Sequence, residues 1–302
     1  MEIYAITPTL KLLNLQPPIP GYGKFIGAYL FQGKKSAIID VGPKAAIPNL
    51  LQALTELNLS PGEIDYIVLT HIHIDHAGGV GTALKEISNA KVLAHNRAIP
   101  HLVDPTTLWQ NSLKTLGELA IKYGEIEPVP EHRILAVTDQ MKLDLGNDLT
   151  LEIYLTPGHA THHLSIFDRA NGVLIAGEAA GVCIEGNVRP ATPPPFKLEE
   201  TLASIDKLMN LKPQKLCYGH FGCYDRAGER LKAYRQKLID WHKIVGASAK
   251  SGKNPEEILT LLRQKDNSLS YLDHLDRDEY AREFALLINS IKGLAGSAQG
   301  RQ

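Results

Sequence analysis

Apolar and polar residues in the first three quarters of the chain form two alternating kinds of segment. Short apolar runs predict strands, and they cover Ile64–Leu69, Leu149–Leu155, Gly172–Gly177 and Lys215–Gly219. Between them, helical spacing of apolar residues predicts helices over Pro43–Leu57, Val80–Ile87 and Asp104–Tyr123. Strands and helices that alternate in this way indicate the α/β fold class.

After residue 225 the pattern becomes helical throughout. Helical spacing covers Ala227–Val245, a segment opened by Asn254, and Asp276–Leu294. Asn254 followed by Pro255 is a typical helix start, whereas residues 293–302 are expected to fray. The Pro-rich stretch Glu185–Phe196 is expected to be a loop. The sequence therefore predicts a domain over residues 1–225 and a C-terminal helical extension over residues 226–302.

The first predicted strand is followed by a dense group of potential metal ligands. His71, His73, Asp75 and His76 lie within six residues, directly before Gly78-Gly79. If the strand continues, His71 and His73 point to the same side, and Asp75 and His76 can address a second point beyond the turn. Imidazole and carboxylate ligands suit zinc, iron or manganese, and the absence of a thiolate argues against a zinc finger.

The other three predicted strands each end near a further ligand. These residues are His159, Glu178 and His220, and each follows a glycine directly. The set divides between two divalent metal ions. His71, His73 and His159 are expected to bind one metal, and Asp75, His76 and His220 the other, with Glu178 between them.

In type and order these residues resemble the signature of the metallo-β-lactamase superfamily, HxHxDH followed by a distal His, a bridging acid and a last His. The resemblance covers residues 1–225 and implies an αββα sandwich with a dinuclear centre at one edge. It also implies that Asp40 braces the ligand loop and that His163 holds a neighbouring ligand in place. The family's bridging acid is normally Asp, so Glu178 is expected to bridge both metals, to bind one of them, or to hold another ligand.

The helical extension resembles one branch of this superfamily. That branch includes the quinolone-signal response thioesterase and archaeal relatives, in which a similar extension caps the entrance to the active site. Two other roles are compatible with the helices of residues 226–302. They form a homodimer interface, or they simply cover the sheet.

The charge of the expected centre favours hydrolysis. Two divalent ions, two carboxylates and one shared hydroxide leave a positive, electrophilic centre, so a metal-bridging hydroxide can attack a carbonyl carbon. The first hypothesis is a hydrolase of an acyl thioester or lactone, in which Asp75 both binds metal and orients the water. The alternatives are a phosphodiesterase, a mononuclear-iron persulfide dioxygenase, and a non-catalytic ligand sensor or interaction protein.

The composition favours a small-molecule substrate over nucleic acid or a membrane as the binding partner. The 302 residues carry a net charge of −1, and no run of Lys or Arg exceeds a pair, which argues against nucleic acid. No apolar stretch approaches the roughly 20 residues of a membrane span, and the start lacks a basic signal region. The cysteines, Cys183, Cys217 and Cys223, form no CxxC pair. A cytoplasmic location and buried, unpaired thiols are therefore expected.

Overall fold

The computed structural model describes residues 2–300, and the chain divides into two compact units. Unit 1 comprises Met1–Leu155 and Leu164–Val173, and unit 2 comprises Thr156–His163 and Leu174–Gln302. The predicted division into a domain over residues 1–225 and a helical extension over residues 226–302 stays a prediction.

Unit 1 contains a seven-stranded sheet whose strands follow chain order. The strands are β1 (Ile3–Thr7), β2 (Leu10–Asn14), β3 (Gly27–Gln32), β4 (Ser36–Ile39), β5 (Ile64–Val68), β6 (Lys91–His95) and β7 (Ile134–Val137). Strands β1 to β4 pair antiparallel, and β4 to β7 pair parallel. Every residue of β4 is buried, which is typical of a strand whose two faces are both covered.

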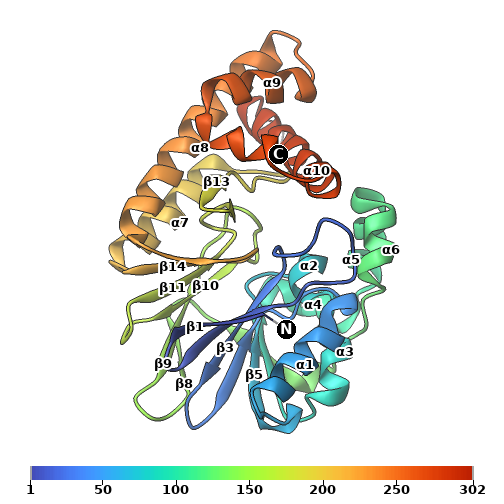
Figure 1. The fold of residues 1–302 in the computed structure, drawn as a ribbon, viewed down its shortest axis with the longest axis vertical. Coiled ribbons are helices and arrows are strands. Elements are labelled where there is room, and N and C mark those ends of the chain that lie inside the picture. The colour runs from blue at the N-terminus through green and yellow to red at the C-terminus, as the bar shows by residue number, and fades with distance from the viewer. Residues whose placement is uncertain (1, 301–302) are drawn as a thin grey trace. The chain divides into compact units, whose positions relative to one another are not determined.

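The helices of unit 1 lie between and after these strands. They are α1 (Ile47–Glu56), α2 (Ile74–Ala77), α3 (Val80–Glu86), α4 (Ile99–Val103), α5 (Thr106–Leu116) and α6 (Glu118–Tyr123). Helices α1 and α3 lie on one face of the seven-stranded sheet (Figure 1). Helix α1 buries Leu50, Ala53 and Leu54, which are spaced as one face of a helix.

The single helix predicted over Asp104–Tyr123 is wrong, because two helices occupy that range. Helix α5 ends at Leu116, and the next residue, Gly117, has φ +57°. A residue in this region of backbone space cannot continue a right-handed helix, and glycine adopts it at little cost. The apolar spacing continues across the break, so spacing alone could not reveal it.

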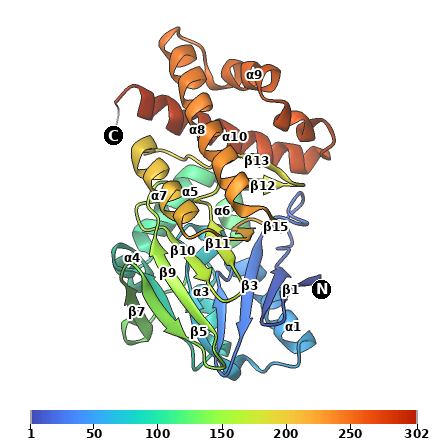
Figure 2. The same cartoon turned by 90° about the vertical axis from the view of Figure 1, so that its left-hand side faces the viewer.

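Unit 1 also contains an antiparallel meander of three strands, β8 (Met141–Asp144), β9 (Thr150–Leu155) and β10 (Leu164–Asp168). The meander lies on the face of the seven-stranded sheet opposite α1 and α3 (Figures 1 and 2). Leu151, Ile153 and Ile166 have no exposed surface. Burial of these side chains fills the layer between the meander and the sheet.

Unit 2 contains the remaining strands and all the C-terminal helices. The strands are β11 (Val173–Gly177), β12 (Val182–Ile184), β13 (Asn187–Arg189), β14 (Lys215–Tyr218) and β15 (Cys223–Asp225). The helices are α7 (Leu198–Asn210), α8 (Ala227–Lys250), α9 (Pro255–Lys265) and α10 (Arg277–Ala298).

The prediction that residues 185–196 form only loop is wrong at its start. Strands β12 and β13 form a hairpin in which Ile184 pairs with Asn187. The two residues between them, Glu185 and Gly186, both have positive φ, as a tight two-residue hairpin turn requires.

Helices α8 and α10 lie side by side (Figures 1 and 2). Both are longer than predicted, and the expected fraying from residue 293 is wrong as far as Ala298. The reason is packing, since Gly293 and Leu294 are buried. The predicted start of α9 is confirmed, because the Asn254 side chain accepts a hydrogen bond from the Glu257 N–H.

In the part of the chain that the structure describes, each helix is too short or too polar to cross a lipid bilayer.

Candidate metal centre

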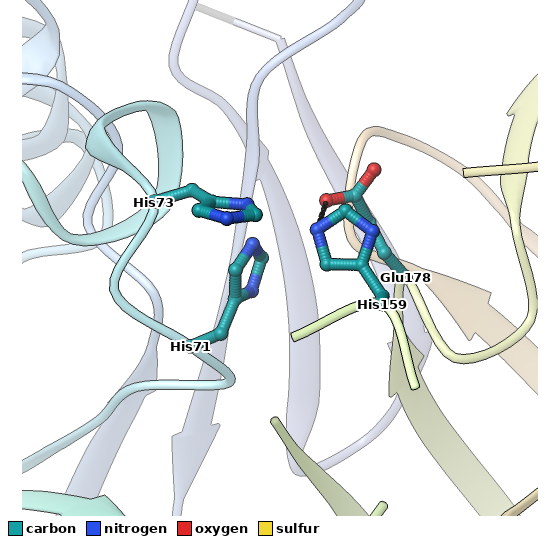
Figure 3. Close-up of side chains that lie close together, drawn as sticks. All are labelled: His71, His73, His159 and Glu178. Atoms are coloured by element: carbon teal, nitrogen blue, oxygen red, sulfur yellow. Dashed lines mark ion pairs between the residues drawn. The ribbon is translucent and has the colours of Figure 1, made fainter. Parts of the chain in front are cut away.

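The ligand-rich segment after β5 is a loop and a single helical turn. Strand β5 ends at Val68, and His73 is the N-cap residue of α2. The strand alternation expected to align His71 with His73 is therefore wrong. Their rings nevertheless lie edge to face with centroids 4.6 Å apart (Figure 3). Asp75 and His76 follow within α2, where Asp75 Oδ2 lies 3.9 Å from His76 Nε2.

Asp40 holds this segment through its buried carboxylate. The carboxylate accepts hydrogen bonds from the Thr70 N–H and the Thr70 hydroxyl, both at 2.7 Å. Its Oδ2 also lies 3.0 Å from His76 Nδ1. The expectation that Asp40 braces the ligand loop is confirmed by these bonds.

The same network sets which ring nitrogen of each histidine a metal would bind. Because a carboxylate only accepts, His76 donates from Nδ1. The Thr70 hydroxyl donates to Asp40, so it accepts from His71 Nδ1, which lies 3.0 Å away. In both rings Nε2 is then the nitrogen with the lone pair, as in histidines whose other nitrogen is held by a neighbour.

Unit 2 brings His159, Glu178 and His220 together. His159 follows β9, Glu178 follows β11 and His220 follows β14, and all three side chains are buried. Glu178 Oε2 lies 2.8 Å from His159 Nε2 (Figure 3). Its other oxygen, Oε1, lies 3.3 Å from His220 Nε2. One carboxylate therefore presents one oxygen to each of two imidazoles.

Burial opposes ionisation of Glu178, but the two histidines outweigh it. The charges and hydrogen bonds of His159 and His220 hold the pKa of Glu178 well below its ordinary value. A buried carboxylate that stays ionised at neutral pH needs positive partners. Metal cations would meet that need as the imidazoles do here.

Main-chain and side-chain groups of unit 2 fix these three residues. His159 Nδ1 donates to the Ala191 carbonyl at 2.9 Å, which again makes Nε2 the nitrogen that a metal would bind. The Glu178 N–H donates to His163 Nε2 at 3.1 Å, and His163 Nδ1 lies 2.9 Å from the Thr156 hydroxyl. The supporting role predicted for His163 is confirmed, and it acts on the backbone of Glu178.

Glycine is required directly before His159. Gly158 has φ +151°, and a Cβ there would lie 2.5 Å from Thr201 Oγ1 and 2.8 Å from Thr201 Cα. Thr201 belongs to α7, and Ser204 of the same helix donates to the Pro157 carbonyl at 2.6 Å. Helix α7 therefore packs directly on the backbone that presents His159.

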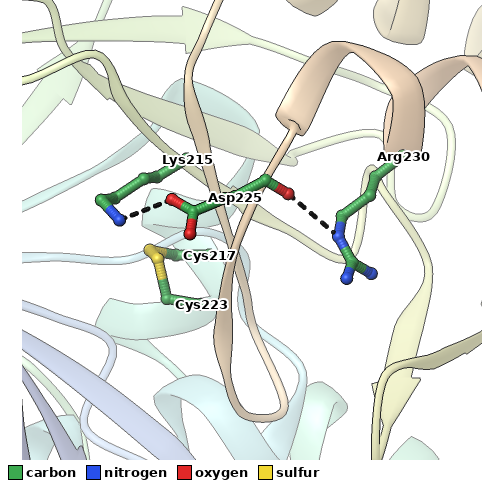
Figure 4. The surroundings of a disulfide bond; sticks show 5 residues. All are labelled: Lys215, Cys217, Cys223, Asp225 and Arg230. Atoms are coloured by element: carbon green, nitrogen blue, oxygen red, sulfur yellow. Dashed lines mark hydrogen bonds and ion pairs between the residues drawn. A yellow bond between two sulfur atoms is a disulfide. The ribbon is translucent and has the colours of Figure 1, made fainter.

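His220 lies in the turn of a hairpin that a disulfide closes. Cys217 of β14 and Cys223 of β15 are directly opposite and form the bond (Figure 4). At the open end of the hairpin Lys215 pairs with Asp225 at 2.7 Å. The expectation of three unpaired thiols is wrong for these two cysteines, because it took no account of the hairpin register. Cys183 is a buried free thiol, and burial raises its pKa.

Sequence reasoning missed the groups that hold the ligands. Thr70 and Thr156 bond ligand or supporting imidazoles through hydroxyls, and their only sequence signal is a position next to a strand end. Ala191 acts through its carbonyl oxygen, for which a side chain gives no signal at all.

The chain belongs to the metallo-beta-lactamase superfamily, whose sequence profile matches residues 23–220. This match spans the HxHxDH segment, His159, Glu178 and His220. The predicted family and the predicted fold class, an α/β metallo-β-lactamase fold with C-terminal helices, are thereby confirmed.

One archaeal and one bacterial relative illustrate the similarity. The metallo-beta-lactamase fold-containing protein ST1585 of Sulfurisphaera tokodaii is 32% identical over 199 residues, covering 64% of this chain and 72% of the relative. Its crystal structure gives a TM-score of 0.65 at 27% identity over 77% of this chain and 87% of that one. The probable metallo-hydrolase YqjP of Bacillus subtilis is 27% identical over 56% of this chain and 57% of the relative.

A structural neighbour extends the similarity of fold to nearly the whole chain. The family protein TTHA1429 of Thermus thermophilus gives a TM-score of 0.68 at 24% identity, over 96% of this chain and 93% of that one. At this identity the likeness shows the fold alone. The 4% of the chain outside the match is shorter than α8, with 24 residues, or α10, with 22 residues, so the likeness extends into both of these helices.

Proposed function

We propose that the protein is a metal-dependent hydrolase with two divalent ions. His71, His73 and His159 bind one ion, Asp75, His76 and His220 bind the other, and Glu178 contributes one oxygen to each. The observation that carries the proposal is the carboxylate of Glu178, whose oxygens lie 2.8 Å and 3.3 Å from the Nε2 atoms of His159 and His220. A side chain placed in this way can serve both metals despite the extra methylene relative to Asp.

The donor set fits zinc or iron, with manganese possible. Five of its seven donors are imidazole nitrogens, which these ions accept and which calcium and magnesium, as oxygen-binding ions, favour less. The bonds from Asp40, Thr70 and Ala191 to the Nδ1 atoms support the same assignment, because metal-binding histidines are usually held through their second nitrogen.

When bound, the metals would lower the pKa of water to about 7 and polarise the substrate's carbonyl oxygen. The protein's own groups then orient the reaction. Asp75, which is only half-buried, can accept a hydrogen bond from the attacking water and take its proton. Asp40 accepts the hydrogen bond from the His76 Nδ1–H and so orients the ring, with Nε2 as the nitrogen that would bind metal.

The substrate class we propose is an acyl thioester or a lactone. A net charge of −1 and the absence of long basic runs favour an uncharged carbonyl group over a phosphodiester. The description of the relative YqjP as a probable metallo-hydrolase is in line with hydrolysis. No macromolecular partner is required by this proposal.

Metal analysis combined with a substrate panel tests the proposal. Protein purified without added ions is assayed for zinc, iron and manganese, and for turnover of an acyl thioester, a lactone and an aryl phosphodiester with and without chelator. We expect two ions per chain and chelator-sensitive turnover of the first two substrates. Metal without turnover would refute the hydrolase, and a single iron per chain would favour persulfide dioxygenation.

Variants locate the metals on the named residues. Glu178→Gln keeps the size of the side chain but removes its charge, and we expect it to lower metal content to one ion or fewer per chain. Glu152→Gln is the matched control, because Glu152 is a partly buried, ion-paired carboxylate outside the donor set. Equal metal content in the two variants would remove Glu178 from the ligands.

A further inference from the structure

We propose that helices α8 and α10 position the metal ligand His159 by holding the segment Pro190–Thr192, called here the support loop. The inference rests on the proposed function, because it takes His159 to be a ligand. It gives the C-terminal helices a role in the centre itself, in addition to any role as a cap or an interface.

The support loop contacts His159 through one main-chain oxygen. The Ala191 carbonyl accepts the Nδ1–H of His159 at 2.9 Å. Since a carbonyl oxygen can only accept, this bond fixes both the direction of the ring and the nitrogen that carries the proton. The position of the Ala191 peptide therefore determines where His159 Nε2 points.

Helix α8 holds Ala191 on the side of its N–H group. The Ala191 N–H donates to the hydroxyl oxygen of Tyr234, and Tyr234 is buried in α8. Burial raises the pKa of this hydroxyl further above its ordinary value, so it stays neutral. Ala191 is thus bonded on its N–H side to α8 and on its carbonyl side to His159.

Helix α10 holds the residues on either side of Ala191. The Ser290 hydroxyl donates to the Pro190 carbonyl at 3.1 Å and accepts from the Thr192 N–H at 3.4 Å. The Thr192 hydroxyl donates to the Ser290 carbonyl at 3.0 Å. A Cβ at Gly293 would lie 1.9 Å from the Thr192 carbonyl oxygen, so the loop and the helix backbone are in direct contact.

A buried ion pair anchors the residue that precedes the support loop. Arg189 Nε and Nη2 donate to the Glu283 carboxylate at 2.5 Å and 3.2 Å, and the Tyr271 hydroxyl donates to it at 2.8 Å. Both charged side chains are almost fully buried. Such a pair adds little net stability compared with apolar packing, but it tolerates only one arrangement of its partners. It therefore fixes where the chain enters the support loop.

Two pairs of variants separate positioning from simple loss of a hydrogen bond. Tyr234→Phe and Ser290→Ala each remove a hydroxyl that touches the support loop. Tyr280→Phe and Ser251→Ala are the controls. The Tyr280 ring of α10 stacks on Phe284, and the Ser251 hydroxyl at the end of α8 donates to the Ser248 carbonyl.

The first measurement is the binding of Zn²⁺ by the full chain, in competition with a chromophoric chelator. Loss of a group that orients a metal-binding histidine typically weakens binding 10- to 100-fold. We expect at least a tenfold weaker dissociation constant for one ion in Tyr234→Phe and Ser290→Ala. The two controls should stay within about twofold of the wild type.

The second measurement needs no metal. The nitrogen and proton resonances of the His159 ring in the metal-free chain report whether Nδ1 carries the proton and how fast that proton exchanges. We expect one protected Nδ1–H in the wild type and both controls. Faster exchange or mixed protonation of both ring nitrogens is expected in Tyr234→Phe and Ser290→Ala.

The outcomes distinguish the two proposals. If the wild type binds zinc but all four variants match it in affinity and in the His159 signal, the inference is wrong and the proposed function stands. If the wild type binds no metal, the proposed function is wrong and the inference fails with it. Equal weakening by the test and control variants would also overturn the inference, since that result reflects general destabilisation.

Discussion

The buried ion pair between Arg189 and Glu283 should make the free energy of unfolding of unit 2 fall at low pH. Burial disfavours the charge on Glu283, but Arg189 outweighs it and lowers the pKa of Glu283 to about 2, from an ordinary value of 4.5. A carboxyl group with a lowered pKa stabilises the folded state fully above its unfolded pKa. That contribution is lost as pH falls through the folded pKa of about 2.

The magnitude follows from the difference between the two pKa values. At about 1.4 kcal/mol per pKa unit, the ionised form of Glu283 contributes about 3 kcal/mol to the free energy of unfolding above pH 5. By the same relation, the contribution of Glu283 to the free energy of unfolding falls to about 1 kcal/mol at pH 3. Glu283→Gln abolishes the charge at every pH, so it should cost about 3 kcal/mol at pH 7 and about 1 kcal/mol at pH 3.

Urea unfolding followed by tryptophan fluorescence measures this difference. Trp241 is buried in α8, and a Trp109→Phe background makes it the only tryptophan. Unfolding of Glu283→Gln and its parent is compared at pH 7, 5 and 3. Glu229→Gln is the control, because Glu229 belongs to an exposed ion pair at the start of α8. A difference that stays constant with pH, or is absent at pH 7, would refute the reasoning.

Three further predictions concern the metal ligands and their surroundings. Asp40→Asn leaves one acceptor oxygen for three donors, so it should weaken zinc binding about 10- to 100-fold. Unchanged binding in a calorimetric titration would contradict the bracing role of Asp40. Gly293→Ala should lower the thermal midpoint because its Cβ would meet the Thr192 carbonyl, whereas Gly228→Ala in α8, with open space around it, should stabilise by about 0.5–1 kcal/mol. Chelation of the metals should lower the thermal midpoint of unfolding, because metal at a thousandfold excess over its Kd would stabilise the folded chain by about 4 kcal/mol. An unmoved midpoint would count against any bound metal.

The elements of the fold were predictable wherever burial imposed a simple pattern. All four predicted strands are present, as β5, β9, β11 and β14, because continuous apolar runs have few other uses in a chain of this composition. The break at Gly117 was not predictable, since glycine within a helical pattern costs only about 1 kcal/mol. The order of residues 293–298 depends on packing partners about 100 residues earlier in the chain, such as Thr192, which local patterns do not encode.

The candidate ligands were predictable by type and the groups that hold them were not. Three histidines and an acid within six residues have a chemical explanation but no packing explanation. Their alignment, in contrast, comes from a loop held by Asp40 and not from the strand geometry used to predict it. The carbonyl of Ala191 and the hydroxyls of Tyr234 and Ser290 act through folded geometry alone, so no spacing in the sequence points to them.

The distance in sequence between the support loop and α10 affects when the centre can be completed during synthesis. Pro190 and Ser290 are 100 residues apart, and at translation rates of about 5–20 residues per second the helix follows the loop by roughly 5–20 s. During that interval the support loop lacks its hydrogen bonds to Ser290 of α10. Under the positioning role proposed for α10, metal uptake in the final geometry would come after α10 has been made, and a nascent chain that met excess metal earlier would be exposed to binding in a wrong arrangement.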